Sequence, residues 1–179
     1  MPDRVPVHTL PTLFIFSGLP ASGKTTLARK LSAYTGAIFL RIDTLEQSLR
    51  DFCSLDVQGE GYQLAYRLAK DNLQLGCSVV ADACNAIALT REAWRQVAQS
   101  TGAKSANIEV FCSDIVEHQT RVETRTTTVP HLKLPDWDAV INREYHPWQA
   151  QHHTIDTAHR SADDCFEELL RKLDLSETM

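Results

Sequence analysis

The sequence predicts an α/β fold in three layers, in which helices cover both faces of a five-stranded, mainly parallel sheet. Short apolar runs alternate with helical segments along the chain, which is the pattern of strands linked by crossover helices. Several of these runs are followed by polar residues, and ligands bind beyond the carboxyl ends of such strands. The chain has 179 residues, the size of one domain, so we expect a single domain over residues 1–179.

The individual elements follow from hydrophobic spacing and from start and stop residues. Predicted strands cover residues 12–16, 38–42, 78–81, 107–111 and 152–155. Predicted helices cover residues 24–34, 43–52, 59–75, 90–100, 136–145 and 161–173, with a further helix capped by Ser113 or Asp114. Ser161 and Asp164 have the spacing of a capping box at the start of the last helix.

A segment without clear periodicity lies between the fourth and fifth predicted strands. Residues 126–135 contain three threonines and two prolines, which favours an irregular excursion over a core element. Together with the flanking helical residues it suggests a short helical lid over about residues 120–147.

Composition and charge narrow the function classes. Apolar residues make up 43% of the chain and charged residues 23%, as in folded globular proteins. The formal net charge of −5 gives no general attraction for nucleic acid or an anionic membrane. No early apolar run is long enough for a membrane span, and the five scattered cysteines fit the reducing cytosol, so we expect a cytoplasmic protein.

The strongest motif lies between the first predicted strand and the first predicted helix. Residues 18–25 read G-L-P-A-S-G-K-T, a full match to the phosphate-binding Walker A pattern G-x-x-x-x-G-K-[ST]. Gly18 and Gly23 allow the loop to curl so that its backbone N–H groups face a phosphate. Lys24 supplies a cation for the β- and γ-phosphates, and the Thr25 hydroxyl is expected to bind Mg²⁺. The predicted nucleotide-binding residues are Gly18, Pro20, Ala21, Ser22, Gly23, Lys24, Thr25 and Thr26.

The stretch from Gly18 to Thr26 resembles the P-loop of the polynucleotide-kinase-like and zeta-toxin-like small kinases, which are often grouped as AAA-type ATP-binding domains. The resemblance extends to residues 41–43, 79–85 and 121–125 in the same order. It implies a P-loop NTPase fold with Mg²⁺ and ATP as cofactors. ATP is favoured over GTP because the N-K-x-D tetrapeptide of guanine recognition is missing from the sequence.

In those kinases an aspartate at the end of the second strand accepts the proton of the acceptor hydroxyl, and Asp43 resembles it in position. Asp43 with Glu46 three residues later also fits a helix N-cap, and we keep both interpretations. The family pattern often places an arginine soon after this aspartate, whereas here Leu45 and Glu46 follow and Arg50 is more distant. Acceptor recognition is therefore expected to differ.

Polar residues also end the third predicted strand. Asp82 could hold Mg²⁺ or orient the acceptor, and Asn85 is close enough in sequence to share that task. The alternative is that both residues satisfy loop N–H groups. Arg91, near the start of the next helix, is interpreted as a solvated or phosphate-facing charge.

Arg121 and Arg125 are four residues apart and would share one helix face beside the lid. Both could neutralise charge on the triphosphate, or they could form surface pairs with Glu117 and Glu123. The resemblance also implies that His159, after the fifth strand, borders the adenine.

Two functions remain open: an ATP-dependent kinase acting on a hydroxyl group, and an ATP-binding or ATP-hydrolysing regulatory protein. The kinase is favoured because Asp43 and the lid supply a base and water exclusion, which transfer needs. We expect a small-molecule or nucleotide-type acceptor, with a nucleic-acid end not favoured, no membrane partner, and no indication of oligomeric state.

Overall fold

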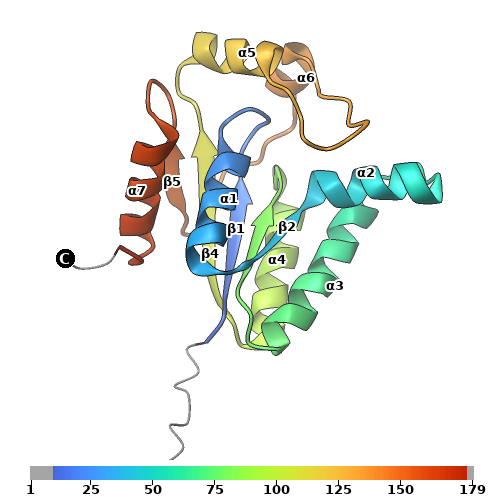
Figure 1. The fold of residues 1–179 in the computed structure, drawn as a ribbon, viewed down its shortest axis with the longest axis vertical. Coiled ribbons are helices and arrows are strands. Elements are labelled where there is room, and N and C mark those ends of the chain that lie inside the picture. The colour runs from blue at the N-terminus through green and yellow to red at the C-terminus, as the bar shows by residue number, and fades with distance from the viewer. Residues whose placement is uncertain (1–9, 177–179) are drawn as a thin grey trace, which may run out of the picture.

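The computed structural model describes residues 10–176, and its strands form one parallel sheet in the order β2-β3-β1-β4-β5 (Figure 1). The strands are β1 (Thr12–Ser17), β2 (Ile38–Arg41), β3 (Val79–Asp82), β4 (Lys104–Phe111) and β5 (His153–Asp156). All four neighbouring pairs are parallel, with Phe16 of β1 opposite Asp82 of β3 and Ile108 of β4. The predicted five-stranded parallel sheet is confirmed.

Helices cover both faces of this sheet (Figure 1). Their bounds are α1 (Lys24–Thr35), α2 (Ile42–Cys53), α3 (Glu60–Gln74), α4 (Ala88–Thr101), α5 (Ile115–Thr124), α6 (Trp137–Ile141) and α7 (Ala162–Lys172). The alternation of side chains along β1 explains the two cores, since Leu13 and Ile15 face α3 and α4, whereas Phe14 and Phe16 face α1 and α7. None of the helices within residues 10–176 is long and apolar enough to cross a bilayer.

Several element ends differ from the prediction, and three of these differences follow from particular contacts. β4 begins at Lys104 because it pairs with β1 from Thr12 onward. α2 begins at Ile42, one residue early, because the Ile42 side chain is buried in the core beside α3 and α4. The last predicted element before β5 is much shorter, since α6 ends at Ile141. There His146 precedes Pro147, which disfavours helix, and its N–H donates to Ala86 O at 2.8 Å.

Residues 115–152, which connect β4 to β5, are called the crossover segment here. α5 and α6 lie beyond the carboxyl ends of the strands, above the loop that joins β1 to α1 (Figure 1). Asp114 caps α5 by accepting hydrogen bonds from the N–H groups of Val116 and Glu117. Ser161 is the N-cap of α7, and its hydroxyl accepts from the N–H of Asp164. The Asp164 carboxylate accepts from the Ser161 hydroxyl, so the structure shows one half of the predicted capping box. The crossover segment therefore covers the edge of the sheet where ligands bind in such folds.

Candidate active site

The loop of residues 18–23 joins β1 to α1 and adopts a tightly curled backbone. Gly18 has φ +140° and Gly23 has φ +95°, and a Cβ added at Gly18 would collide with the carbonyl oxygen of Val110. Ala21 also has a positive φ, of +64°. Positive φ values at several positions of one loop turn neighbouring N–H groups to the same side, which makes an anion-binding concavity at the start of α1. The glycines of the motif are thus required by backbone geometry.

Three side chains hold carbonyl groups of this loop. The ammonium of Lys24 lies 3.4 Å from the Leu19 carbonyl, and an imidazole nitrogen of His118 on α5 lies 2.8 Å from the Pro20 carbonyl. The Thr157 hydroxyl, just after β5, donates to the Ser22 carbonyl at 2.9 Å. Because these oxygens are engaged, the loop is held in place. The N–H groups of Gly18 and Ser22 donate to the Cys84 and Leu19 carbonyls at 3.0 and 3.3 Å, so the N–H groups at the start of α1 are the ones left for a ligand.

Asp82 is a buried acid at the end of β3, beside the first turn of α1. It is 2% exposed, and neither carboxylate oxygen has a hydrogen-bond partner within residues 10–176. Burial raises the pKa of Asp82, while the Lys24 charge and the Thr25 hydroxyl oppose that rise. An unpartnered buried carboxylate next to a hydroxyl is a donor set that fits Mg²⁺. The structure therefore brings together the two predicted metal ligands, Thr25 and Asp82.

Arg41 connects Asp82 with the neighbouring strand end. Its Nε lies 4.0 Å from Asp82 Oδ2 and its Nη2 lies 3.6 Å from Asp43 Oδ2. The N-cap of α2 is Arg41, without a side-chain cap bond, and Asp43 lies in the first turn. The N-cap interpretation of Asp43 is therefore wrong. Its carboxylate, 53% exposed, is left available at the positive end of the α2 dipole.

Arg125 lies on the crossover segment close to Asp43. α5 ends at Thr124, and Arg125 has an extended backbone with φ −67° and ψ 150°. Its Nε and Nη2 are buried and have no partner within the described residues. Burial lowers the pKa of Arg125 and the Asp43 charge opposes this. An unpaired guanidinium thus stands next to the candidate base.

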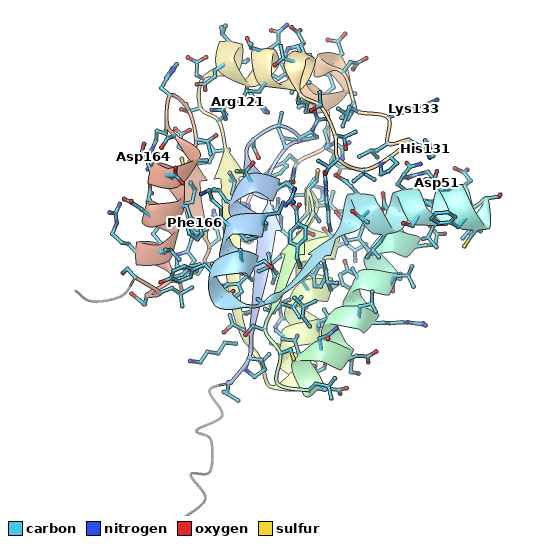
Figure 2. All side chains as sticks on the ribbon, viewed as in Figure 1. Asp51, Arg121, His131, Lys133, Asp164 and Phe166 are labelled. Atoms are coloured by element: carbon cyan, nitrogen blue, oxygen red, sulfur yellow. The ribbon has the colours of Figure 1, made fainter. Side chains whose placement is uncertain are left out.

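Arg121 does not share a helix face with Arg125, because α5 ends at Thr124 and Arg125 lies beyond it. Its guanidinium donates to the Thr157 hydroxyl at 2.7 Å, to the Thr157 carbonyl at 2.8 Å and to Glu117 at 2.5 Å. Figure 2 shows Arg121 below α5. The prediction that both arginines act together on the triphosphate needs correction, since Arg121 braces Thr157 and pairs with Glu117.

Asn85 is also placed differently from the prediction. Its side chain is fully buried, with Nδ2 donating to the Phe16 carbonyl at 2.7 Å and Oδ1 accepting from Trp94 Nε1 at 3.1 Å. Both ends of the amide are engaged inside the fold. The acceptor-binding role predicted for Asn85 is therefore wrong, and the residue joins β1, the loop after β3, and α4.

Arg91 is buried, so its interpretation as a solvated or phosphate-facing charge is wrong. The guanidinium donates to the carbonyl groups of Asn85, Ala86 and His146 at 2.7, 3.0 and 2.9 Å. Its Cζ lies 4.2 Å from the centre of the Trp148 ring. Arg91 fastens the end of the crossover segment to the loop that follows Asp82.

His159 lies after β5 and has φ +54°. Its exposed ring is 2.9 Å from Asp114 and 3.3 Å from Glu117. Its contact with adenine stays a prediction.

Sequence reasoning missed His118 and Thr157. Neither residue belongs to a motif, and each reaches the loop from an element far along the chain. The position of Thr157 directly after a strand of the sheet was the one available signal.

Comparison with known proteins agrees with this geometry. A sugar kinase from Janibacter sp. is similar in structure, with a TM-score of 0.67 and 13% identity over 94% of this chain and 96% of that chain. An APS kinase from Mycobacterium tuberculosis, solved with AMPPNP and APS, gives 0.65 and 18% over 92% and 98%. A gluconokinase from Sinorhizobium meliloti gives 0.67 and 13% over 92% and 93%. These similarities show the fold that P-loop kinases have.

No curated protein matches the sequence. A family model described as an AAA domain matches residues 13–143. That range contains the phosphate-binding loop, Asp43, Asp82 and most of the crossover segment. The chain belongs to the AAA domain family.

Proposed function

We propose that the protein is a kinase that transfers the γ-phosphate of Mg-ATP to a hydroxyl group of a small-molecule or nucleotide-type acceptor. The observation that carries this proposal is that Lys24 and Asp43 both lie close enough to the buried Asp82 to influence its pKa. Arg41 contacts both aspartates. Lys24 and Asp82 serve the donor, and Asp43 is free to serve an acceptor. Similarity in fold to a sugar kinase, an APS kinase and a gluconokinase supports this assignment.

The donor site would hold the triphosphate on backbone N–H groups between Ala21 and Thr25, with Lys24 beside the β- and γ-phosphates. Thr25 and Asp82 fit Mg²⁺, which would neutralise charge on the transferred group when bound. Burial of Asp82 favours this role, because a buried carboxylate whose oxygens accept no hydrogen bond gains much from a nearby cation.

Asp43 would accept the proton of the acceptor hydroxyl. Arg41 Nη2 lies 3.6 Å from this carboxylate, the carboxylate lies at the positive end of the α2 dipole, and no cap bond occupies it. Such a base contributes by aligning the nucleophile as well as by taking its proton.

Arg125 would stabilise the negative charge that develops on the phosphoryl group. Its Nε and Nη2 have no hydrogen-bond partner within residues 10–176, so charge stabilisation costs neither of them an existing contact. The segment around residues 120–147 would act as a lid that completes the site and excludes water. Arg121 contributes indirectly, through Thr157 and the Ser22 carbonyl.

Hydrolysis of ATP without another acceptor is the second candidate function. The observation that favours it is the exposure of Asp43, whose side chain is 53% accessible, so that water reaches the candidate base. The two candidates differ in where the γ-phosphate goes.

The test follows γ-phosphate from labelled Mg-ATP to a panel of sugars, sugar acids, nucleosides, nucleotides and 5′-hydroxyl oligonucleotides. The variants are Lys24→Ala and Asp43→Asn, with Asp71→Asn, an exposed acid on α3, as the matched control. The proposal predicts transfer by wild type and Asp71→Asn, loss with Asp43→Asn although ATP still binds, and loss of ATP binding with Lys24→Ala. Release of the label as inorganic phosphate alone, with no labelled organic product from any member of the panel, would favour the hydrolase.

A further inference from the structure

A cavity of about 550 Å³ lies between α2 and residues 128–131 of the crossover segment. Its lining includes Arg41 and Thr44, and the candidate base Asp43 lies between these two residues in the chain. This volume suits one small ligand. The cavity therefore opens beside the group that would activate an acceptor, and it is separate from the phosphate-binding loop.

The two walls of the cavity are held together by polar contacts. His131 Nδ1 lies 3.1 Å from Asp51 Oδ2 on α2, and Figure 2 shows these two side chains side by side. The Arg41 guanidinium donates to the Thr128 hydroxyl at 3.2 Å. The crossover segment is thus attached to α2 and to the end of β2, and the cavity has a defined shape without a ligand.

The charges of the lining favour an anion. Arg29 of α1 and Arg41 of β2 both line the cavity, and Arg29 takes part in none of the salt bridges found in residues 10–176. The acid in the lining, Asp51, already accepts from Gln47 at 2.7 Å and contacts His131. A guanidinium without an acidic partner is a favourable partner for a carboxylate, sulfate or phosphate.

The remaining surface of the cavity is apolar and partly aromatic. Phe39 of β2 and Phe52 of α2 line it, together with Val129 and Pro130 of the crossover segment. The Phe52 side chain is 85% exposed, although large aromatic groups are usually covered. A flat, apolar group bound here would remove that ring from water.

We propose that this cavity binds the phosphoryl acceptor, and that the acceptor is a small organic anion with a flat apolar part. The identification of the ligand as the acceptor rests on the proposed kinase function, whereas the anion-binding chemistry does not. Arg29 binds the anionic group, because Arg41 already pairs with Asp43 and Asp82, and the two phenyl rings contact the flat part. Thr44 lines the cavity beside Asp43, where an acceptor hydroxyl would stand.

The experiment uses Phe52→Trp as a fluorescent reporter, because this exposed ring lies at the cavity and the native tryptophans, Trp94, Trp137 and Trp148, do not line it. Benzoate and benzyl alcohol are titrated as probes in the absence of nucleotide. They share the ring, and only benzoate carries the charge. We expect a saturable change with benzoate at concentrations at least about tenfold below those needed for benzyl alcohol, since a hydrogen bond to a charged group strengthens binding by about that factor or more.

Arg29→Gln in the reporter background should weaken benzoate about tenfold and leave benzyl alcohol unchanged. Arg95→Gln, at an exposed arginine paired with Glu92 on α4, is the matched control and should change neither titration. Equal responses to the two probes, no response to either, or benzoate binding that ignores Arg29→Gln would overturn the proposal. These titrations do not depend on phosphate transfer. The proposed kinase function and the proposed anion-binding cavity can therefore be refuted independently of each other.

Discussion

The substitution Asn85→Ala distinguishes a structural role of Asn85 from a role in acceptor binding. The substitution removes the donor to the Phe16 carbonyl and the acceptor of the Trp94 N–H, and both groups are buried. Each unsatisfied group costs about 1–3 kcal/mol. Alanine at φ +44° adds strain of about 1 kcal/mol, and water entering the vacated space offsets part of the loss. We therefore expect unfolding free energy to fall by about 3 kcal/mol.

Equilibrium unfolding in urea measures this loss, with an unchanged slope if the transition stays two-state. For a chain of this size the melting temperature should fall by roughly 6–12 °C. Asn72→Ala is the control, because Asn72 Nδ2 donates to the Leu68 carbonyl on an exposed helix surface where water can replace it. Its cost should stay below about 0.5 kcal/mol. If Asn85→Ala kept wild-type stability and lost only acceptor binding, the structural assignment of Asn85 would be refuted.

Three further predictions concern Gly18 of the phosphate-binding loop, the buried Asp82, and Arg91, which joins the end of the crossover segment to the loop after β3. Gly18→Ala should abolish pyrophosphate binding in a calorimetric titration and cost more stability than Gly102→Ala, because both glycines have positive φ and only Gly18 meets the Val110 carbonyl; equal stability of the two variants would contradict this. Burial raises the folded-state pKa of Asp82, so its ionised form costs stability above that pKa and stability increases as pH falls through it. Without nucleotide, Asp82→Asn should therefore have a higher melting temperature than wild type at pH 7.5, and the difference should be smaller at pH 5. A lower melting temperature of the variant at pH 7.5 would contradict the inference that ionised Asp82 destabilises the fold. Arg91→Lys keeps the charge but loses the forked guanidinium that reaches several carbonyl groups, so the free energy of unfolding should fall by about 2 kcal/mol. Proteolysis within residues 143–151 should become faster, and an unchanged rate would show that Arg91 does not hold this segment.

The sheet and the phosphate-binding loop were predictable because short-range physics determines them. Parallel strands need apolar residues on both faces, and the curled loop needs glycine where φ is positive, as at Gly18 and Gly23. Asp43 lies two residues after the end of β2, in the first turn of α2, whereas the sequence placed it at the N-cap of that helix. The start of α2 depends on the burial of Ile42, which the spacing of Asp43 and Glu46 does not reveal.

The side-chain errors have a common cause, since long-range contacts decide where a polar group points. Asn85 turns inward because Trp94 and the end of β1 supply its partners. Arg91 is covered by Trp148, 57 positions further along the chain. The spacing of Arg121 and Arg125 implied one helix face, but α5 ends between them. The roles of His118 and Thr157 likewise follow from tertiary structure alone.

The most direct test of the central claim measures where the γ-phosphate of labelled Mg-ATP goes when the protein is given a deproteinised metabolite extract. Products are separated by chromatography for wild type and Asp43→Asn, at ATP concentrations that saturate both. The proposed mechanism predicts a labelled organic product with wild type, and a rate roughly 10²–10⁴-fold lower with Asp43→Asn at unchanged ATP affinity. Label found only in inorganic phosphate, released at the same rate by both proteins, would contradict it.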